Sequence, residues 1–142
     1  MIIYQAMIPL NPKTKKNNQD IKFKSSTKNG FFKKTAYGLK YAGVPFISQS
    51  EAYKQYEIDA GWFLKKIPSP ISEPVNVKCI FYRKDRTRCD LTNLLEAIDD
   101  ILVKYKILAD DNFNIIVSHD GSRVLIDKDN PRTVVEITKI KY

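Results

Sequence analysis

The stretch "VNVKCIFYRKDRTRCDLTNLLEAIDDILVKY", residues 75–105, decides the fold, because its apolar residues change periodicity part-way along it. In residues 75–83 apolar side chains alternate, as in a strand with one buried face. These are Val75, Val77, Cys79 and Phe81. From residue 91 they recur every three or four positions, as on the buried stripe of a helix. This stripe is Leu91, Leu94, Leu95, Ile98, Ile101 and Leu102. We therefore expect a strand, a basic turn and a helix.

Elements of the same two kinds flank this unit. Residues 2–10 predict a first strand, and residues 48–68 predict a helix whose first turn is closed by a capping box of Ser48 and Glu51. Three further strands are expected at 113–118, 122–126 and 133–141. The order β–α–β–α–β–β–β predicts an α+β fold: one domain over residues 1–142, with two main helices packed on a mixed β-sheet.

The composition is that of a soluble globular protein, with 142 residues, 43% of them hydrophobic and 28% charged. No apolar run approaches the ~20 residues that span a bilayer, so we expect no membrane partner. The N-terminus lacks the charged and small-residue signals of a secretory leader. Cys79 and Cys89 have no metal-type spacing and are interpreted as reduced thiols of a cytoplasmic protein.

The net charge of +8 lies entirely in the first 42 residues. They hold nine lysines and one acid, Asp20, whereas residues 43–142 hold 15 basic and 15 acidic residues. Residues 10–42 form a long basic segment, expected to be a loose hairpin turning at Asn29-Gly30. Two interpretations stay open: a mobile, solvated loop, or a surface that contacts the DNA backbone through lysines such as Lys13, Lys15, Lys16, Lys33 and Lys34.

Six carboxylates lie between residues 90 and 111, directly behind the basic run from Arg83 to Arg88. Asn93, Glu96 and Asp100 are spaced i, i+3, i+7 and therefore share one face of the predicted helix. Asp90 stands at the helix start, where a cap is the alternative to a functional role. Asp99 points away from that face and is interpreted as plain surface charge.

A length argument brings two of these carboxylates together. A helix over 91–104 is about 21 Å long, and residues 105–111 can reach about 23–25 Å, so Asp111 can return beside Asp90. Adjacent carboxylates repel each other unless a cation lies between them, and oxygen ligands favour Mg²⁺, with Mn²⁺ as the alternative ion. A metal site surrounded by arginine and lysine side chains suits phosphodiester hydrolysis. No Walker-type loop, nucleophilic-cysteine motif or zinc-ligand set competes with it, and no nucleotide cofactor is expected.

His119 is the only histidine and lies in "SHDG", a predicted turn at residues 118–121. Histidine is the general base in some nucleases. A single histidine in a turn is more often a surface residue, and His119 is interpreted as one.

The stretch from Arg88 to Asn112 resembles the RusA family of Holliday-junction resolvases, which cut four-way DNA junctions. The family pattern is Asp-x-Asp-Asn-x-x-Lys at a helix start, then Asp-Ala-Leu, then an Asp-Asp pair. The matching residues here are Asp90, Asn93, Asp100-Ile101-Leu102 and Asp110-Asp111. Two positions depart from it, since Thr92 replaces the second Asp and Glu96 replaces the Lys. We hypothesise that Glu96 restores the lost carboxylate and that Arg86 or Arg88 supplies the lost cation.

The resemblance implies a homodimer that makes paired cuts on opposite strands of a junction, and such proteins are, as a class, phage- or prophage-associated. The leading hypothesis is a Mg²⁺-dependent, structure-selective endodeoxyribonuclease. Its catalytic residues would be Asp90, Asp111, Asp110 and Glu96, the first three also binding the metal. Its DNA contacts would be Lys13, Lys15, Lys16, Lys33, Lys34, Arg86 and Arg88. Two rivals remain: a catalytically silent DNA-binding module, and a structural protein whose basic segment binds another acidic polymer such as RNA.

Overall fold

The computed structural model describes residues 1–15, 19–24, 31–35 and 38–141, and it confirms an α+β fold with a mixed sheet and two helices. In chain order the elements are β1 (Ile2–Ile8), β2 (Gln19–Lys24), β3 (Phe31–Thr35), β4 (Gly38–Gln49), α1 (Glu51–Gly61), β5 (Val75–Arg83), α2 (Leu91–Lys104), β6 (Ile116–Ser118), β7 (Arg123–Ile126) and β8 (Arg132–Lys139). The predicted strand at 75–83 and the predicted helix from residue 91 are both confirmed.

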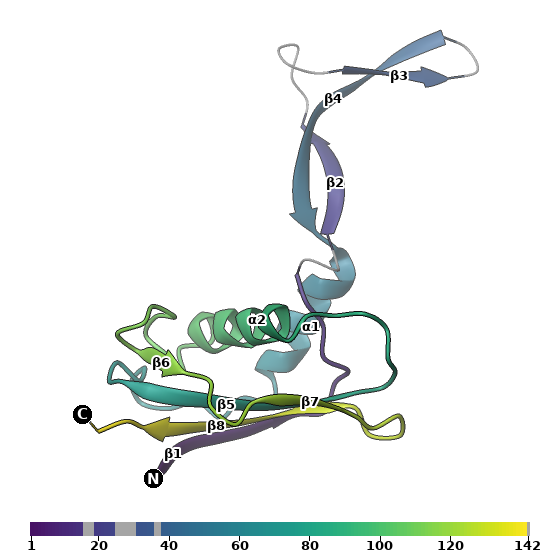
Figure 1. Cartoon of the computed structure of the whole chain (residues 1–142). Helices are drawn as coiled ribbons and strands as arrows, with labels where there is room; N and C mark the ends of the chain where they lie inside the picture. The colour runs from purple at the N-terminus through teal and green to yellow at the C-terminus, as the bar shows by residue number, and fades with distance from the viewer. Residues whose placement is uncertain (16–18, 25–30, 36–37, 142) are drawn as a thin grey trace.

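Strand β5 is the centre of the main sheet (Figure 1). It pairs antiparallel with β8, from Val75 opposite Lys139 to Tyr82 opposite Arg132. Its other edge pairs parallel with β6 near its start and with β7 near its end. Strand β1 extends the sheet beyond β8, again antiparallel. The sheet therefore contains both pairing modes, as predicted.

Both helices lie on the same side of this sheet (Figure 1) and bury that face. All four alternating side chains of β5 are fully buried, as their spacing predicted. The α2 stripe is confirmed at four positions: Leu94, Ile98, Ile101 and Leu102. Leu91 is exposed and Leu95 only partly buried, while Ala97 is buried instead. Burial of each leucine or isoleucine stabilises the fold by about 1.5–3 kcal/mol, so this stripe fixes α2 on the sheet.

Helix α1 is shorter than predicted at both ends. Its N-cap is Ser50, whose side-chain oxygen accepts a hydrogen bond of 3.1 Å from the Tyr53 N–H. The prediction of Ser48 as the cap was wrong, because β4 continues through residue 49 and Ser48 is a strand residue. The helix ends at Gly61, where the ring of Tyr105 packs so closely that an added Cβ would lie 2.2 Å from the Cζ of that ring.

The basic segment forms a second, three-stranded sheet in the order β2-β4-β3. Strand β2 pairs with the second half of β4 and β3 with the first half, both antiparallel. The described strands thus pair through β4, which differs from the hairpin predicted about residues 29–30, and that turn itself lies outside the described residues. Figure 1 shows this ribbon projecting away from the main sheet. Strand β4 has 12 residues, or about 40 Å of extended chain.

Within the described part of the chain, neither helix has the length and apolar character needed to cross a membrane. Both cysteines are free, Cys79 in the core and Cys89 partly buried at the start of the α2 region.

Candidate active site

The turn between β5 and α2 and the segment after β1 enclose a cavity of about 310 Å³, here called the basic cavity. The two segments are joined by the Lys84 N–H, which donates to the Asn11 side-chain oxygen at 3.0 Å. The lining residues are Asn11, Pro12, Lys13, Thr14, Arg83, Lys84, Asp85, Thr87, Arg88 and Cys89. The fold therefore brings residues from two distant parts of the sequence around one polar hollow.

The basic cavity is suited to an anion. Its lining includes four cations, Lys13, Arg83, Lys84 and Arg88, and one carboxylate, Asp85. Arg83 donates through Nη1 to the Thr87 carbonyl, while its buried Nε has no hydrogen-bond partner among the described residues. Leaving a buried donor unpaired costs about 1–3 kcal/mol, and the cations that line the cavity are the groups that can form charge-assisted hydrogen bonds with an anion.

Asp90 begins α2 beside the basic cavity but does not cap the helix with its side chain. Its Oδ2 accepts a hydrogen bond of 3.4 Å from the Asn93 side chain, and the residue is exposed. It lines a further cavity of about 520 Å³ together with Thr87, Arg88 and Cys89, three residues that also line the basic cavity. Asp90 therefore occupies the N-cap position, as the alternative predicted, but its carboxylate makes no capping hydrogen bond and faces solvent next to the cations.

Asp110 and Asp111 lie in the loop between α2 and β6 and differ in their surroundings. Asp110 accepts from the Asn112 side chain at 2.7 Å and from the Asp111 N–H at 2.8 Å, and these bonds lower its pKa. The pKa of Asp111 is raised by partial burial, by its hydrogen bond with Asp110, and by the negative charges of Asp100 and Asp110. Mutual repulsion of this kind favours a bound cation near Asp111.

Asp111 lines a cavity of about 260 Å³ along α2, here called the acidic cavity. Its lining residues are Thr92, Leu95, Glu96, Asp99, Asp111 and His119. The chain thus runs back along α2 after the helix ends, as the length argument predicted. Asp90 and Asp111 nevertheless line separate cavities. Glu96 and Thr92 do share a cavity with Asp111, which is what the hypothesis of a compensating Glu96 requires.

The prediction that Asp99 is plain surface charge was wrong. Its side chain is only 13% exposed, and its Oδ2 lies 2.9 Å from Nε2 of His119. Burial raises its pKa, against the lowering effect of His119 and with a further increase from Asp111 and Asp100. His119 is likewise no surface residue: 25% of its side chain is exposed, and its Nδ1 lies 2.7 Å from the Val77 carbonyl oxygen. The two therefore form a half-buried carboxylate–imidazole pair.

Asp100, a match to the family pattern, forms an ion pair with Lys15. Lys15 belongs to the segment that follows β1, so this contact joins that segment to the middle of α2. Lys15, which was predicted to contact DNA, is therefore held beside a carboxylate of α2.

The other predicted DNA contacts are distributed over three places. Lys13 and Arg88 line the basic cavity, and Arg86 lies exposed in the turn beside it. Lys33 and Lys34 lie in β3, opposite Lys40 and Leu39 of β4. Lys16 lies outside the described residues.

The carboxylates have the right chemistry for Mg²⁺ but do not form a closed cage. Within the described residues, no three histidine, cysteine or carboxylate side chains are arranged to hold a metal ion. Mg²⁺ commonly keeps several waters and binds through one or two carboxylates plus substrate phosphates, so such a cage is not required. Partial desolvation, the hydrogen bond with Asp110 and the charges of Asp100 and Asp110 raise the pKa of Asp111, and a cation bound at this carboxylate would offset that repulsion.

The sequence model of the family described as Endodeoxyribonuclease RusA matches residues 9–138. The chain belongs to the RusA family. This confirms the resemblance, and the match covers both cavities and all the predicted site residues. RusA-family proteins are endodeoxyribonucleases that act on Holliday junctions. Among curated proteins, none matches this chain.

Proposed function

We propose that this RusA-family protein is a metal-dependent nuclease that resolves four-way DNA junctions by paired, symmetric cuts. The observation that carries the proposal is that a basic cavity, an exposed carboxylate and an acidic cavity follow one another along the start of α2. The basic cavity precedes the helix, Asp90 stands at its start, and the acidic cavity with Asp111 follows. Phosphates bound among the cations would leave the neighbouring phosphodiester beside carboxylates.

The chain's own residues would divide the work. The four cations of the basic cavity would hold the sugar–phosphate backbone, which positions a strand without reading its sequence. Asp111 would bind Mg²⁺ or Mn²⁺ together with the DNA phosphate, and Glu96 in the same cavity would supply the carboxylate that Thr92 lacks. Asp110 would fix the Asp111 backbone, and Asp90 would add its negative charge from the neighbouring cavity. Such an ion, when bound, activates a water and neutralises charge developing on the phosphate.

Paired cutting would require two sites related by symmetry, so we propose a homodimer. A four-way junction is itself two-fold symmetric in suitable conformations, and a two-fold dimer would place one site on each of two opposing strands. A supercoiled plasmid with an extruded inverted repeat tests this directly. Paired cuts in one binding event give linear DNA, whereas independent cuts give nicked circles first.

The cutting activity is tested with a synthetic four-way junction and a linear duplex of the same sequence, with and without Mg²⁺ or Mn²⁺. We expect cleavage of the junction only with metal. Asp111→Asn should abolish cleavage but keep binding, and Asp129→Asn, an exposed carboxylate between β7 and β8 that lines neither cavity, is the matched control. Glu96→Gln should also lower cleavage strongly, and unchanged cleavage would contradict compensation for Thr92. Binding without cutting by the wild-type protein would instead favour a silent DNA-binding module.

A further inference from the structure

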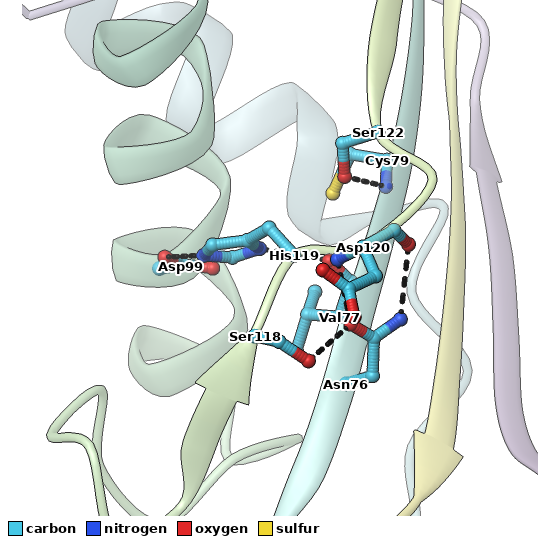
Figure 2. A network of polar contacts seen from close by, with 8 residues as sticks. All are labelled: Asn76, Val77, Cys79, Asp99, Ser118, His119, Asp120 and Ser122. Carbon is cyan, nitrogen blue, oxygen red and sulfur yellow. Dashed lines mark hydrogen bonds and ion pairs between the residues drawn. The ribbon is translucent and has the colours of Figure 1, made fainter.

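The turn at residues 118–122 is fixed to β5 by hydrogen bonds on both sides of His119 (Figure 2). Asn76 is the main anchor: its Oδ1 accepts from the Ser118 hydroxyl at 2.6 Å and from the Asp120 N–H at 2.7 Å. Its Nδ2 donates to the Asp120 carbonyl, and the Cys79 N–H donates to the Ser122 hydroxyl at 2.9 Å. The backbone that carries His119 is thus held in one place, with the imidazole between β5 and α2.

Donor and acceptor roles show that His119 and Asp99 share a proton. The Val77 carbonyl can only accept, so Nδ1 of His119 carries a hydrogen. At 2.9 Å, a second proton must lie between Nε2 and the Asp99 carboxylate, on one partner or the other. In either arrangement the pair as a whole is uncharged.

The residues around the His119–Asp99 pair are mostly acidic, so the neutrality of the pair affects the total charge of the acidic cavity. Glu96 and Asp111 line the same cavity, and the charge of Asp100 also acts on Asp99. From β5, the thiol of Cys79 faces Asp99, whose charge adds to burial in raising the pKa of that thiol. His119 is the only basic side chain among the residues that line the acidic cavity. Without it, Asp99 would add a further negative charge where a DNA phosphate must approach.

We infer that His119 is a positioning residue of the nuclease site: fixed by Val77 and its turn, it carries the proton that neutralises Asp99 and keeps the acidic cavity open to a DNA phosphate. Asp99 in return holds the 118–122 turn against α2. This inference rests on the proposed function, because the phosphate is that of the DNA strand to be cut.

The pair is tested first without any DNA. His119 is the chain's only histidine, so its imidazole NMR signals need no assignment. Burial lowers its pKa, but the hydrogen bond with Asp99, that residue's charge and the bond to Val77 raise it above the ordinary value. Asp99→Asn should therefore lower the His119 pKa by about one to three units, and Asp129→Asn should leave that pKa unchanged. An unchanged pKa in Asp99→Asn would overturn the pair.

Junction cleavage tests what the pair does. His119→Gln removes the imidazole that shares the proton. Assayed at a pH where Asp99 alone is ionised, the variant carries one added charge about 10 Å from a phosphate, and at an effective dielectric constant of 20 this should raise KM about 16-fold. The kcat should change less than about twofold, because repulsion acts on ground-state and transition-state binding alike. The double variant Asp99→Asn/His119→Gln removes that charge and should return KM to within about threefold of the wild type.

A merely structural pair gives other results. If only lost hydrogen bonds mattered, the double variant would be at least as impaired as His119→Gln, and that outcome overturns the inference. The pH dependence of KM also distinguishes charge neutralisation from a structural role. In the wild type, KM should rise as the pH passes the His119 pKa. In Asp99→Asn, KM should not change over the same pH range. If the wild-type protein cuts no junction in any metal, the proposed function fails and this inference with it, while the NMR titration still reports whether the proton is shared.

Discussion

Two cations of the basic cavity, Lys13 and Lys84, can be replaced by glutamine with little effect expected on the fold, since the described hydrogen bonds of both residues are made by their backbones. Each phosphate contact that is lost reduces the slope of log K against log salt by about 0.9. The double variant Lys13→Gln/Lys84→Gln should thus have a slope shallower by about 1.8. Over a fourfold increase in salt, the wild type should lose about 12-fold more affinity than this variant.

The assay is fluorescence anisotropy of a labelled four-way junction in EDTA, so that binding is measured apart from cutting. The matched control is Lys66→Gln/Lys141→Gln, which removes the same charge from exposed lysines that do not line the basic cavity. Lys141 follows β8 at the end that pairs with Val75, the first residue of β5. Arg83 is the last residue of β5, so the length of that strand separates Lys141 from Arg83. If the cavity variant and the control have the same slope, the basic cavity does not contact DNA phosphates.

Three further predictions concern stability. Gly61→Ala should cost about 1–3 kcal/mol in urea unfolding through overpacking against Tyr105, and the cost should vanish in a Tyr105→Ala background. Lys15→Gln and Asp100→Asn should couple by about 0.2–1 kcal/mol in a double-mutant cycle, because the two side chains are 29% and 28% exposed; additive effects would contradict their ion pair. The folded-state pKa of the only histidine is raised, so its contribution is complete below the unfolded pKa and is lost as pH rises through the folded one. The stability difference between wild type and Asp99→Asn should therefore narrow as pH rises from about 6 to about 9, and a constant difference would contradict this linkage.

The main sheet and α2 could be predicted because the spacing of apolar residues along the chain indicates which side of each element is buried. Strand β5 has the same bounds as its alternating pattern, and the α2 stripe is buried at four of its six predicted positions. Leu91 fails because it lies in the first turn, at the edge of the contact with the sheet. The periodicity of apolar residues identifies the face of a helix that is buried, but it does not show how far along the helix the contact with the sheet extends.

Strand β4 was not predicted, and Pro45 within it is part of the reason. A proline donates no backbone hydrogen bond and argues against a central strand. In the structure β2 pairs with residues 44–49 of β4 and β3 with residues 38–43, so the stretch around Pro45 has one described neighbour and acts as an edge. Such a staggered arrangement of two partners leaves no signal in a single strand's sequence.

The acidic site was predictable in composition but not in its partners. The spacing of Glu96 and the return of Asp111 follow from helix geometry and chain length, and both residues do line one cavity. The pairing of Asp99 with His119 depends on a turn that packs onto α2 from 20 residues away. No local pattern reports such a contact, although a single histidine flanked by turn residues is a reason to examine it.

The placement of the active site is tested most directly by a cleavage assay with Mg²⁺ on a synthetic four-way junction and its linear duplex, comparing the wild type, Asp111→Asn and Asp129→Asn. We expect the wild type and Asp129→Asn to cut the junction and spare the duplex, and Asp111→Asn to bind the junction with unchanged affinity without cutting it. Cleavage by Asp111→Asn at the wild-type rate would contradict the placement of the active site in the acidic cavity.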